Sequence, residues 1–328
     1  MSSDFWVITS YFNPARYKTK RLNFDAFMEG MNAVGANVLV VEMAFGDAWF
    51  ELEPGERVLH FRGDSVMWQK ERLLNVAAAR LPDSCRKVGW FDADLIFKEP
   101  DWLERTSEAL DRHMVLQPFS HAVRLNRDNC DDGTGSLSES FASIFVRDPA
   151  PARVGNFHSH GHTGFAWAAR REFFEECGLY EASLTGAGDH LMAHAFVAGM
   201  ANSPCMRHVF HGAAHYSEHF IRWGIRARDL AGAKIGVVPG RILHLWHGDL
   251  EDRAYGERLR QFRALGFNPD LHLRHDEGGM LEWSDEAPAH LKTWCEDMFH
   301  GRNEDGERKA APDPAARQAR RTVAATKR

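Results

Sequence analysis

Short apolar runs and amphipathic stretches alternate over the first hundred residues of the chain. Residues 5–10 (Phe-Trp-Val-Ile-Thr-Ser) and 37–43 (Asn-Val-Leu-Val-Val-Glu-Met) are apolar almost throughout, which is typical of strands buried in a parallel sheet. Between them, the apolar side chains of residues 24–31 recur at helical spacing. This pattern predicts a strand, a helix and a strand, with a further strand at residues 58–61.

The next amphipathic stretch leads to the first candidate site. Residues 66–81 have helical periodicity and end at a proline, and residues 87–91 (Lys-Val-Gly-Trp-Phe) form a predicted strand that runs directly into Asp92-Ala-Asp94. Alternation of this kind predicts an α/β fold with a mostly parallel central sheet flanked by helices. Ligands of such sheets bind at the carboxyl ends of the strands, where Asp92 and Asp94 lie.

The pattern is less regular after residue 120. Residues 126–151 are rich in Asp, Asn, Gly, Ser and Pro, which predicts a long loop or insertion. Helices are predicted at residues 171–177 and 190–199, and the last strand at residues 236–246. The polar, proline-containing composition after residue 301 predicts a disordered tail over residues 302–328.

Composition narrows the class of protein. The chain of 328 residues is 44% hydrophobic, enough for a sizeable core, and has no run near the roughly 18 apolar residues of a transmembrane segment. Since the N-terminus also lacks the features of a signal peptide, we expect a cytoplasmic protein. Five dispersed cysteines without a CxxC pair argue against a disulfide framework and a cysteine zinc site. Basic residues dominate from Arg308 onward, which predicts weak attraction to nucleic acid or an anionic surface.

Asp92 and Asp94 are the first candidates for chemistry. Two carboxylates at positions i and i+2 after a buried strand can both reach one hard cation, which prefers oxygen ligands and keeps positions for phosphate oxygens. An Asp-x-Asp triplet is common by chance at this Asp content. Its place between the apolar residues 87–91 and 95–97 is what favours a metal site.

Motifs of GT-A glycosyltransferases occur along the chain in the order found in that family. Residues 68–75 (Trp-Gln-Lys-Glu-Arg-Leu-Leu-Asn) and 88–95 (Val-Gly-Trp-Phe-Asp-Ala-Asp-Leu) resemble its donor half. Residues 161–171 (Gly-His-Thr-Gly-Phe-Ala-Trp-Ala-Ala-Arg-Arg) and 186–192 (Gly-Ala-Gly-Asp-His-Leu-Met) resemble the acceptor side of its galactosyltransferase-like members. Residues 244–248 (His-Leu-Trp-His-Gly) resemble their C-terminal metal-binding segment.

The resemblance covers roughly residues 5–265 and implies sugar transfer from a nucleotide-sugar donor to a hydroxyl acceptor. It implies one GT-A catalytic domain over residues 1–301, made of a donor half to about residue 119, an acceptor and metal half to about residue 265, and a C-terminal appendage over about 266–301. The cofactors it implies are Mn²⁺ or Mg²⁺ and a nucleotide-sugar, with a UDP-sugar as the first choice.

The same resemblance implies a ligand set for the cation. Asp94 holds the metal, Asp92 lies near the ribose or the metal, and a histidine of the last motif completes the shell, imidazole being a reasonable additional ligand. His244 and His247 would point to opposite faces if one strand continued through both. We favour His247.

Asp189 has two interpretations. The resemblance places it where family members hold the carboxylate that deprotonates the acceptor hydroxyl, which implies an inverting displacement. Its position just before a predicted helix that begins near His190 favours helix capping instead, a role that Asp often has.

Further residues are assigned to the donor by their position within the resemblance. Thr9, Ser10 and Tyr11, at the end of the first strand, lie where this fold commonly meets the nucleoside, with Tyr11 able to stack on the base. Gly164 and Trp167, in the acceptor-side motif, also belong to the implied donor-binding set.

Lys70 and Arg72 precede the carboxylates on the predicted helix. Cations there would offset the charge that grows as a nucleoside diphosphate leaves. On a solvated helix face they would be ordinary, and we expect this for one member of the pair.

Residues 157–162 (Phe-His-Ser-His-Gly-His) suggest a different class of enzyme. Because His-x-His spacing ligates zinc in hydrolases, a zinc-dependent hydrolase using His158, His160 and His162 is one alternative. Gly161 stands where a metallo-β-lactamase-like enzyme would carry Asp, which favours an active-site loop instead. A nucleotidyltransferase is the other alternative, although residues 9–16 lack its glycine-rich loop.

Overall fold

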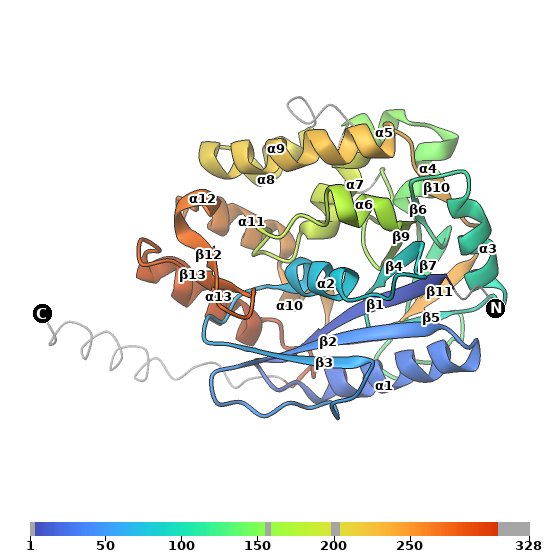
Figure 1. Cartoon of the computed structure of the whole chain (residues 1–328), viewed down its shortest axis with the longest axis horizontal. Coiled ribbons are helices and arrows are strands. Elements are labelled where there is room, and N and C mark those ends of the chain that lie inside the picture. The colour runs from blue at the N-terminus through green and yellow to red at the C-terminus, as the bar shows by residue number, and fades with distance from the viewer. Residues whose placement is uncertain (1–3, 155–158, 198–203, 308–328) are drawn as a thin grey trace, which may run out of the picture.

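A central sheet of seven strands organises the chain (Figure 1). The computed structural model describes residues 4–154, 159–197 and 204–307. The strands of this sheet are β1 (Phe5–Phe12), β2 (Asn37–Phe45), β3 (Val58–Gly63), β4 (Lys87–Phe91), β6 (Val115–Gln117), β9 (Ala166–Arg170) and β10 (Gly236–Val237). Their order is β10-β6-β9-β4-β1-β2-β3, and the pairings are parallel except for β9, which runs antiparallel to β4 and β6. The predicted α/β class with a mostly parallel central sheet is confirmed.

A second, four-stranded sheet brings distant segments to the end of β4. Its strands are β5 (Leu95–Phe97), β7 (His121–Arg124), β8 (Ser136–Glu139) and β11 (Arg241–His244), in the order β5-β11-β7-β8. β5 and β11 are antiparallel, with His244 opposite Leu95. This register places the end of β11 beside Asp94, because the N–H of Leu245 donates to the carbonyl of Asp94 over 2.9 Å.

Helices cover the central sheet on both faces (Figure 1). The helices are α1 (Lys18–Ala33), α2 (Lys70–Ala79), α3 (Trp102–Leu110), α4 (Phe141–Arg147), α5 (Ala150–Val154), α6 (Arg171–Glu176), α7 (Gly188–Val197), α8 (Pro204–Phe210), α9 (Ala214–Ala231), α10 (Leu250–Arg253), α11 (Tyr255–Arg263), α12 (Pro269–His272) and α13 (Ala289–Gly301). A hairpin of β12 (Leu273–His275) and β13 (Leu281–Trp283) precedes α13. Within the described ranges, no helix combines the length and the apolar character needed to cross a bilayer.

The two faces of the sheet bury separate cores. Neighbouring side chains of a strand point to opposite faces, so Val7 packs in one core with Phe27 of α1, and Ile8 packs in the other with Leu73 of α2. All four side chains are fully buried. Burial of each such side chain is worth about 1.5–3 kcal/mol, which fixes α1 and α2 on opposite faces.

Three predicted elements differ from the structure. The predicted loop at 126–151 contains β8 and α4, because Ser140 caps α4 through its Oγ and the next residues, Phe141 and Ala142, are fully buried. The polar composition of the whole segment 126–151 gave no indication of this short helix. The predicted strand 236–246 is two short strands in different sheets, and the predicted helix 66–81 is shorter, as α2.

The C-terminal region is more integrated than predicted. Side chains of the expected appendage, including Leu281, Leu291 and Cys295, belong to the larger core, and the predicted division of the domain stays a prediction. The predicted disordered tail is wrong for residues 302–307, since Arg302 and Glu304 are 8% and 3% exposed. The basic residues after 307 lie outside the described residues, so their attraction to anionic partners stays a prediction.

Candidate active site

A cavity of about 510 Å³ opens at the carboxyl ends of β1 and β4. Besides these two strand ends, its walls come from the loop before β9, the start of α7, the segment after β11, the start of α11 and residues 302–304. This volume lies in the range of cavities that hold small-molecule ligands. The position follows from the topology, since strand ends and crossover loops meet at this edge of the sheet.

Asp94, His244 and His247 converge at one wall of the cavity. Asp94 Oδ2 lies 3.1 Å from His247 Nε2 and 3.7 Å from His244 Nε2, and the two imidazole nitrogens lie 3.1 Å apart. The condition for opposite faces is not met, because β11 ends at His244 and the strand does not continue to His247. Both imidazoles are therefore candidate ligands.

These three side chains fit a divalent cation. Their candidate ligand atoms all lie within 4.8 Å of one another. Asp94 Oδ1 is buried and has no hydrogen-bond partner among the described residues, a costly state that a cation would relieve. A carboxylate with two imidazoles suits Mn²⁺, Fe²⁺ or Zn²⁺ better than Mg²⁺, which prefers oxygen ligands.

The electrostatics of this group favour the ligating forms of Asp94 and His244. Burial opposes ionisation of Asp94, but the neighbouring His244 and His247 outweigh it and lower the pKa of Asp94. Burial holds the pKa of His244 well below its usual range. Burial also opposes protonation of His247, yet Asp94 and Glu304 raise the pKa of this imidazole overall. An ionised carboxylate beside a neutral imidazole is the state in which both bind a metal.

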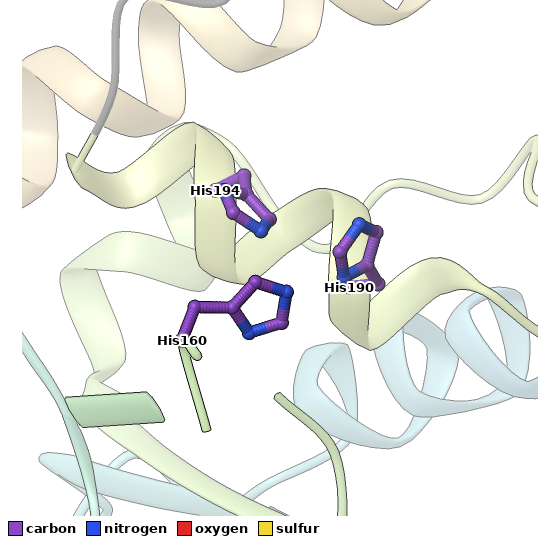
Figure 2. Close-up of side chains that lie close together, drawn as sticks. All are labelled: His160, His190 and His194. Carbon is purple, nitrogen blue, oxygen red and sulfur yellow. The ribbon is translucent and has the colours of Figure 1, made fainter. Parts of the chain in front are cut away.

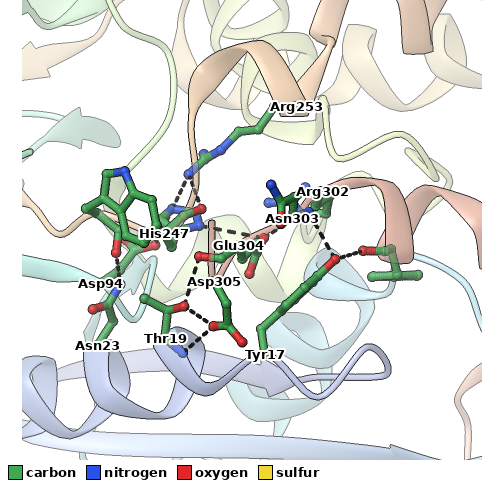
Figure 3. Close-up of polar contacts among 12 residues, drawn as sticks. Tyr17, Thr19, Asn23, Asp94, His247, Arg253, Arg302, Asn303, Glu304 and Asp305 are labelled. Carbon is green, nitrogen blue, oxygen red and sulfur yellow. Dashed lines mark hydrogen bonds and ion pairs between the residues drawn. The ribbon is translucent and has the colours of Figure 1, made fainter. Parts of the chain in front are cut away.

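Glu304 orients His247 from the far side of the ring (Figure 3). Its Oε1 lies 3.6 Å from His247 Nδ1 and 2.5 Å from Arg302 Nε. A carboxylate on Nδ1 leaves Nε2 to face Asp94, which is the usual arrangement around a metal-bound histidine. The sequence analysis missed Glu304 because it lies in the segment predicted to be disordered.

Lys70 links the two other predicted carboxylates. Its Nζ lies 2.6 Å from Asp92 Oδ1 and 2.8 Å from Asp189 Oδ2. Burial opposes the charge of Lys70, but Asp189 and Asp92 raise the pKa of its ammonium well above the usual value. Burial, Asp189 and Asp94 raise the pKa of Asp92 to about 6 despite Lys70. Asp189 lies in the first turn of α7, and its roles as base and as cap stay predictions.

Arg72 points away from the cavity, which corrects its assignment to the donor. It follows Lys70 by two residues on α2, and residues two apart lie on different sides of a helix. Its guanidinium binds Glu181 over 3.0 Å and the carbonyl of Gly279 over 2.6 Å. Arg72 is therefore the ordinary member of the pair.

Of the predicted nucleoside residues, Ser10 and Tyr11 border the cavity. Thr9 is buried, and its hydroxyl donates to the carbonyl of Phe91, so it holds β1 to β4 instead of lining the cavity. Tyr11 is 1% exposed, with its ring edge-on to Phe24 and its hydroxyl bound to Glu51. This packing leaves its ring no exposed face, so the predicted stacking of a base on Tyr11 is wrong.

Of the two residues assigned to the donor from the acceptor-side motif, one lines the cavity and the other is buried in the core. Gly164 lines the cavity, and a Cβ added to it would lie 3.3 Å from Asp189 Oδ2. Trp167 is 1% exposed, stacks on Trp90 and donates from Nε1 to the carbonyl of Thr163. Its assignment to the donor is wrong, because β9 turns this side chain into the core.

Cationic side chains outnumber acidic ones in the cavity, and the sequence analysis identified only Lys70 among them. Among the described lining residues, six are Lys or Arg and four are Asp or Glu. The six are Lys20, Lys70, Arg124, Arg253, Arg258 and Arg302. Such a surplus of positive charge suits a polyanionic ligand.

Arg258 is the clearest of these cations. It is 8% exposed, and none of its three guanidinium nitrogens has a hydrogen-bond partner among the described residues. Its guanidinium lies 4.6 Å above the ring of Tyr255, and burial together with Arg302 lowers its pKa to about 10. Leu259 and Phe262 of α11 are also buried, so Arg258 lies on the apolar face of this helix. A charged residue on an apolar helix face was the sequence signal that could have identified Arg258.

The histidine run does not form one site. His158 lies outside the described residues. His162 contacts Arg124 over 2.6 Å and stacks on Phe165, whereas His160 faces α7. Gly161, with φ 77°, turns the chain between them, which corrects the prediction that His160 and His162 share a zinc ion as in a hydrolase.

Comparisons with known proteins give fold-level likeness only. No model of a known protein family and no curated sequence matches the chain. A structure of Drosophila beta1,4galactosyltransferase 7 with manganese, UDP-Gal and xylobiose is similar at 13% identity and TM-score 0.38, over 88% of this chain and 98% of that one. A putative nucleotide-diphospho-sugar transferase from Desulfovibrio desulfuricans G20 is similar at 10% identity and TM-score 0.34, over 80% and 96%.

A third solved structure, 4-diphosphocytidyl-2C-methyl-D-erythritolsynthase from Anaerococcus prevotii, is similar at 10% identity and TM-score 0.34, over 73% of this chain and 88% of that one. Similarity at this level supports no conclusion about activity. The function of the chain must therefore be argued from its cavity.

Proposed function

We propose that this chain is a metal-dependent glycosyltransferase that moves a sugar from a nucleotide-sugar donor to a hydroxyl acceptor. The observation that carries the proposal is the convergence of Asp94, His244 and His247 in a cavity that also holds Arg258, a buried guanidinium without an anionic partner among the described residues. A candidate cation site beside an unsatisfied guanidinium is suited to a diphosphate.

The metal group has a defined part in this proposal. Asp94, His244 and His247 would hold Mn²⁺, with Glu304 orienting His247. A divalent cation supplies charge stabilisation to the diphosphate as it becomes a leaving group.

The chain's own cations act on the same ligand. Arg258 is free to form paired hydrogen bonds with phosphate oxygens, and this would end its unsatisfied burial. Lys70 is already shared between Asp92 and Asp189. We therefore assign the main phosphate contact to Arg258, with a UDP-sugar as the first donor to test.

Asp189 is the proposed general base. It lines the cavity beside Gly164, and its Oδ2 holds Lys70 over 2.8 Å. A diphosphate close to Lys70 competes with Asp189 for the ammonium. Release of Asp189 from this ion pair leaves its oxygen free to accept the proton of the acceptor hydroxyl, as an inverting transfer requires.

The test is thermal unfolding of the full chain with UDP, GDP, CDP or dTDP, each with and without Mn²⁺. A ligand of the native state at a hundred times its Kd stabilises by about 2.7 kcal/mol, which raises Tm by several degrees. We expect one nucleotide to do so only with metal, and Asp94→Ala to abolish the effect. Asp25→Asn, an exposed carboxylate paired with Arg21, is the matched control. No response to any nucleotide, or an equal response in Asp94→Ala, rejects the proposal.

A second variant tests the assigned base. Asp189→Asn should reduce the turnover of donor hydrolysis, measured as nucleoside diphosphate release, while the metal-dependent Tm shift persists. Equal turnover in Asp189→Asn and the native chain would leave Asp189 as an ion-pair partner of Lys70 and nothing more.

A further inference from the structure

Three imidazoles meet on the α7 side of the cavity (Figure 2). His190 and His194 are four residues apart and share one face of α7, and His160 reaches them from the loop before β9. The ring centroids are 4.6 Å apart for His190 and His194, and 5.4 and 5.0 Å from His160 to these two rings. The three rings therefore point toward one common space.

The surroundings keep these rings neutral. His160, His190 and His194 are 2%, 5% and 0% exposed, and Phe141 lies edge-on to His160 and His194. Burial lowers the pKa of all three imidazoles, that of His194 to about 3. A neutral imidazole is the form that binds a metal ion.

We propose that His160, His190 and His194 form a second metal site, specific for Zn²⁺ and distinct from the Asp94 group. Their candidate ligand nitrogens all lie within 4.8 Å of one another. Tetrahedral zinc with Zn–N bonds of about 2.0–2.1 Å needs nitrogens about 3.3 Å apart. Small rotations of the three histidine side chains would bring their nitrogens from within 4.8 Å to this separation.

The ligand chemistry separates the two sites. Three imidazoles without a carboxylate favour Zn²⁺ over Mn²⁺ and Mg²⁺, which prefer oxygen ligands, whereas the first site includes the carboxylate of Asp94. His160 and His190 line the cavity, so the fourth position of the zinc is open to water or another ligand from that side.

Zinc at this site would tie the loop before β9 to α7. His162 lies two residues after His160, and Asp189 directly precedes His190. The ion would therefore fix the wall of the cavity on which both side chains stand. The inference does not depend on the proposed sugar transfer.

Metal content of the full-length chain tests the inference. After chelator treatment and reloading with Zn²⁺, His194→Ala should hold one zinc per chain fewer than the native chain, whereas His121→Ala, a substitution of an exposed histidine on β7, should keep this zinc. The zinc should also be retained in Asp94→Ala. Loading with Co²⁺ should give the strong visible absorption of tetrahedral coordination, and this absorption should be absent in His194→Ala.

Two results would overturn the inference. One is equal zinc content in the native chain and in folded His194→Ala, judged by circular dichroism. The other is zinc that is lost in Asp94→Ala and kept in His194→Ala, which assigns the ion to the first site. If His194→Ala does not fold, His160→Gln on the loop replaces it, with the same expected loss of zinc. Nucleotide-dependent Tm shifts are read separately, so failure of the proposed transferase function leaves this result interpretable.

Discussion

The carboxylate of Glu71 fills the space beside Gly188 in which any other residue would place its Cβ. This contact joins α2 to the first turn of α7, directly before Asp189. A side chain at position 188 therefore has room only if the buried carboxylate of Glu71 moves.

Gly188→Ala should therefore destabilise the protein, although alanine is the better helix former by about 1 kcal/mol. We expect a net loss of about 1–3 kcal/mol in the free energy of unfolding, because the core must shift to relieve the clash. Urea unfolding measures this. Gly256→Ala on α11, where a Cβ meets nothing within 4 Å, is the control and should be neutral or slightly stabilising. A Gly188→Ala variant of unchanged stability would show that Glu71 moves aside without cost.

Glu71 also predicts a pH dependence of stability. Burial raises its pKa from the usual 4.5 to about 8, and its Oε2 has no hydrogen-bond partner among the described residues. Between these two values the folded state binds a proton that the unfolded state releases. Stability therefore falls as pH rises from 5 to 8, by roughly 2–4 kcal/mol from this group. Urea unfolding at pH 5 and at pH 8 measures this fall in the free energy of unfolding. Glu71→Gln should reduce the fall by the part that comes from Glu71. An equal fall in the variant and in the native chain would contradict the assignment.

Arg258 is expected to stabilise ligand binding at the expense of the fold. Arg258→Met removes a buried charge without a partner, so the free energy of unfolding should rise by about 1–4 kcal/mol. The same change should weaken nucleoside diphosphate binding by roughly 10- to 100-fold, since a charge-assisted hydrogen bond is lost. Arg260→Met, an exposed position on the same helix, should change neither. Calorimetric titration and thermal unfolding give both readouts, and a loss of stability in Arg258→Met would contradict this account.

Glu304→Gln should weaken metal binding without removing a ligand. The carboxylate lies 3.6 Å from His247 Nδ1, and loss of such a partner typically costs 10- to 100-fold in metal affinity. The Mn²⁺ concentration that half-saturates the nucleotide-dependent Tm shift measures this. Glu307→Gln, an exposed carboxylate three residues later, is the control. An unchanged Mn²⁺ requirement would remove Glu304 from the metal environment.

The sequence predicts best what lies next to a strand. Asp92 and Asp94 follow β4 directly, so a strand prediction was enough to place them at the edge of the sheet. The fold class followed from the same apolar alternation. Tyr11 and Trp167 were misplaced because position in a motif does not show which face of a strand a side chain occupies.

Residues joined to the site by tertiary contacts could not be found in this way. Arg258 belongs to a helix whose polar residues look solvated until the cavity is known, and Glu304 lies in a segment of polar composition. The three imidazoles come from a loop and a helix that only the packing of α7 brings together. The periodicity of a local segment carries no information about contacts between residues far apart in the sequence.

Asp305 caps a helix far away in the sequence. Its carboxylate accepts hydrogen bonds from the backbone N–H groups of Lys18 and Thr19, which begin α1, over 3.0 and 2.8 Å. Figure 3 shows Asp305 beside Thr19. Asp305→Ala should lower the free energy of unfolding by about 1 kcal/mol, the usual value of a cap. Truncation after residue 307 should leave Tm unchanged, whereas truncation after residue 301 should lower it. Equal Tm values for the two truncations would contradict this role.

The contact between residues 302–305 and α1 also sets when the cavity can form during synthesis. β1, β4 and the carboxylates of Asp92 and Asp94 are translated long before the wall that carries Glu304. His247 has its orienting partner only after the chain has been translated past residue 304. If Asp94, His244 and His247 hold a metal as proposed, full affinity for it would be reached only at the end of translation, when residues 302–305 meet α1.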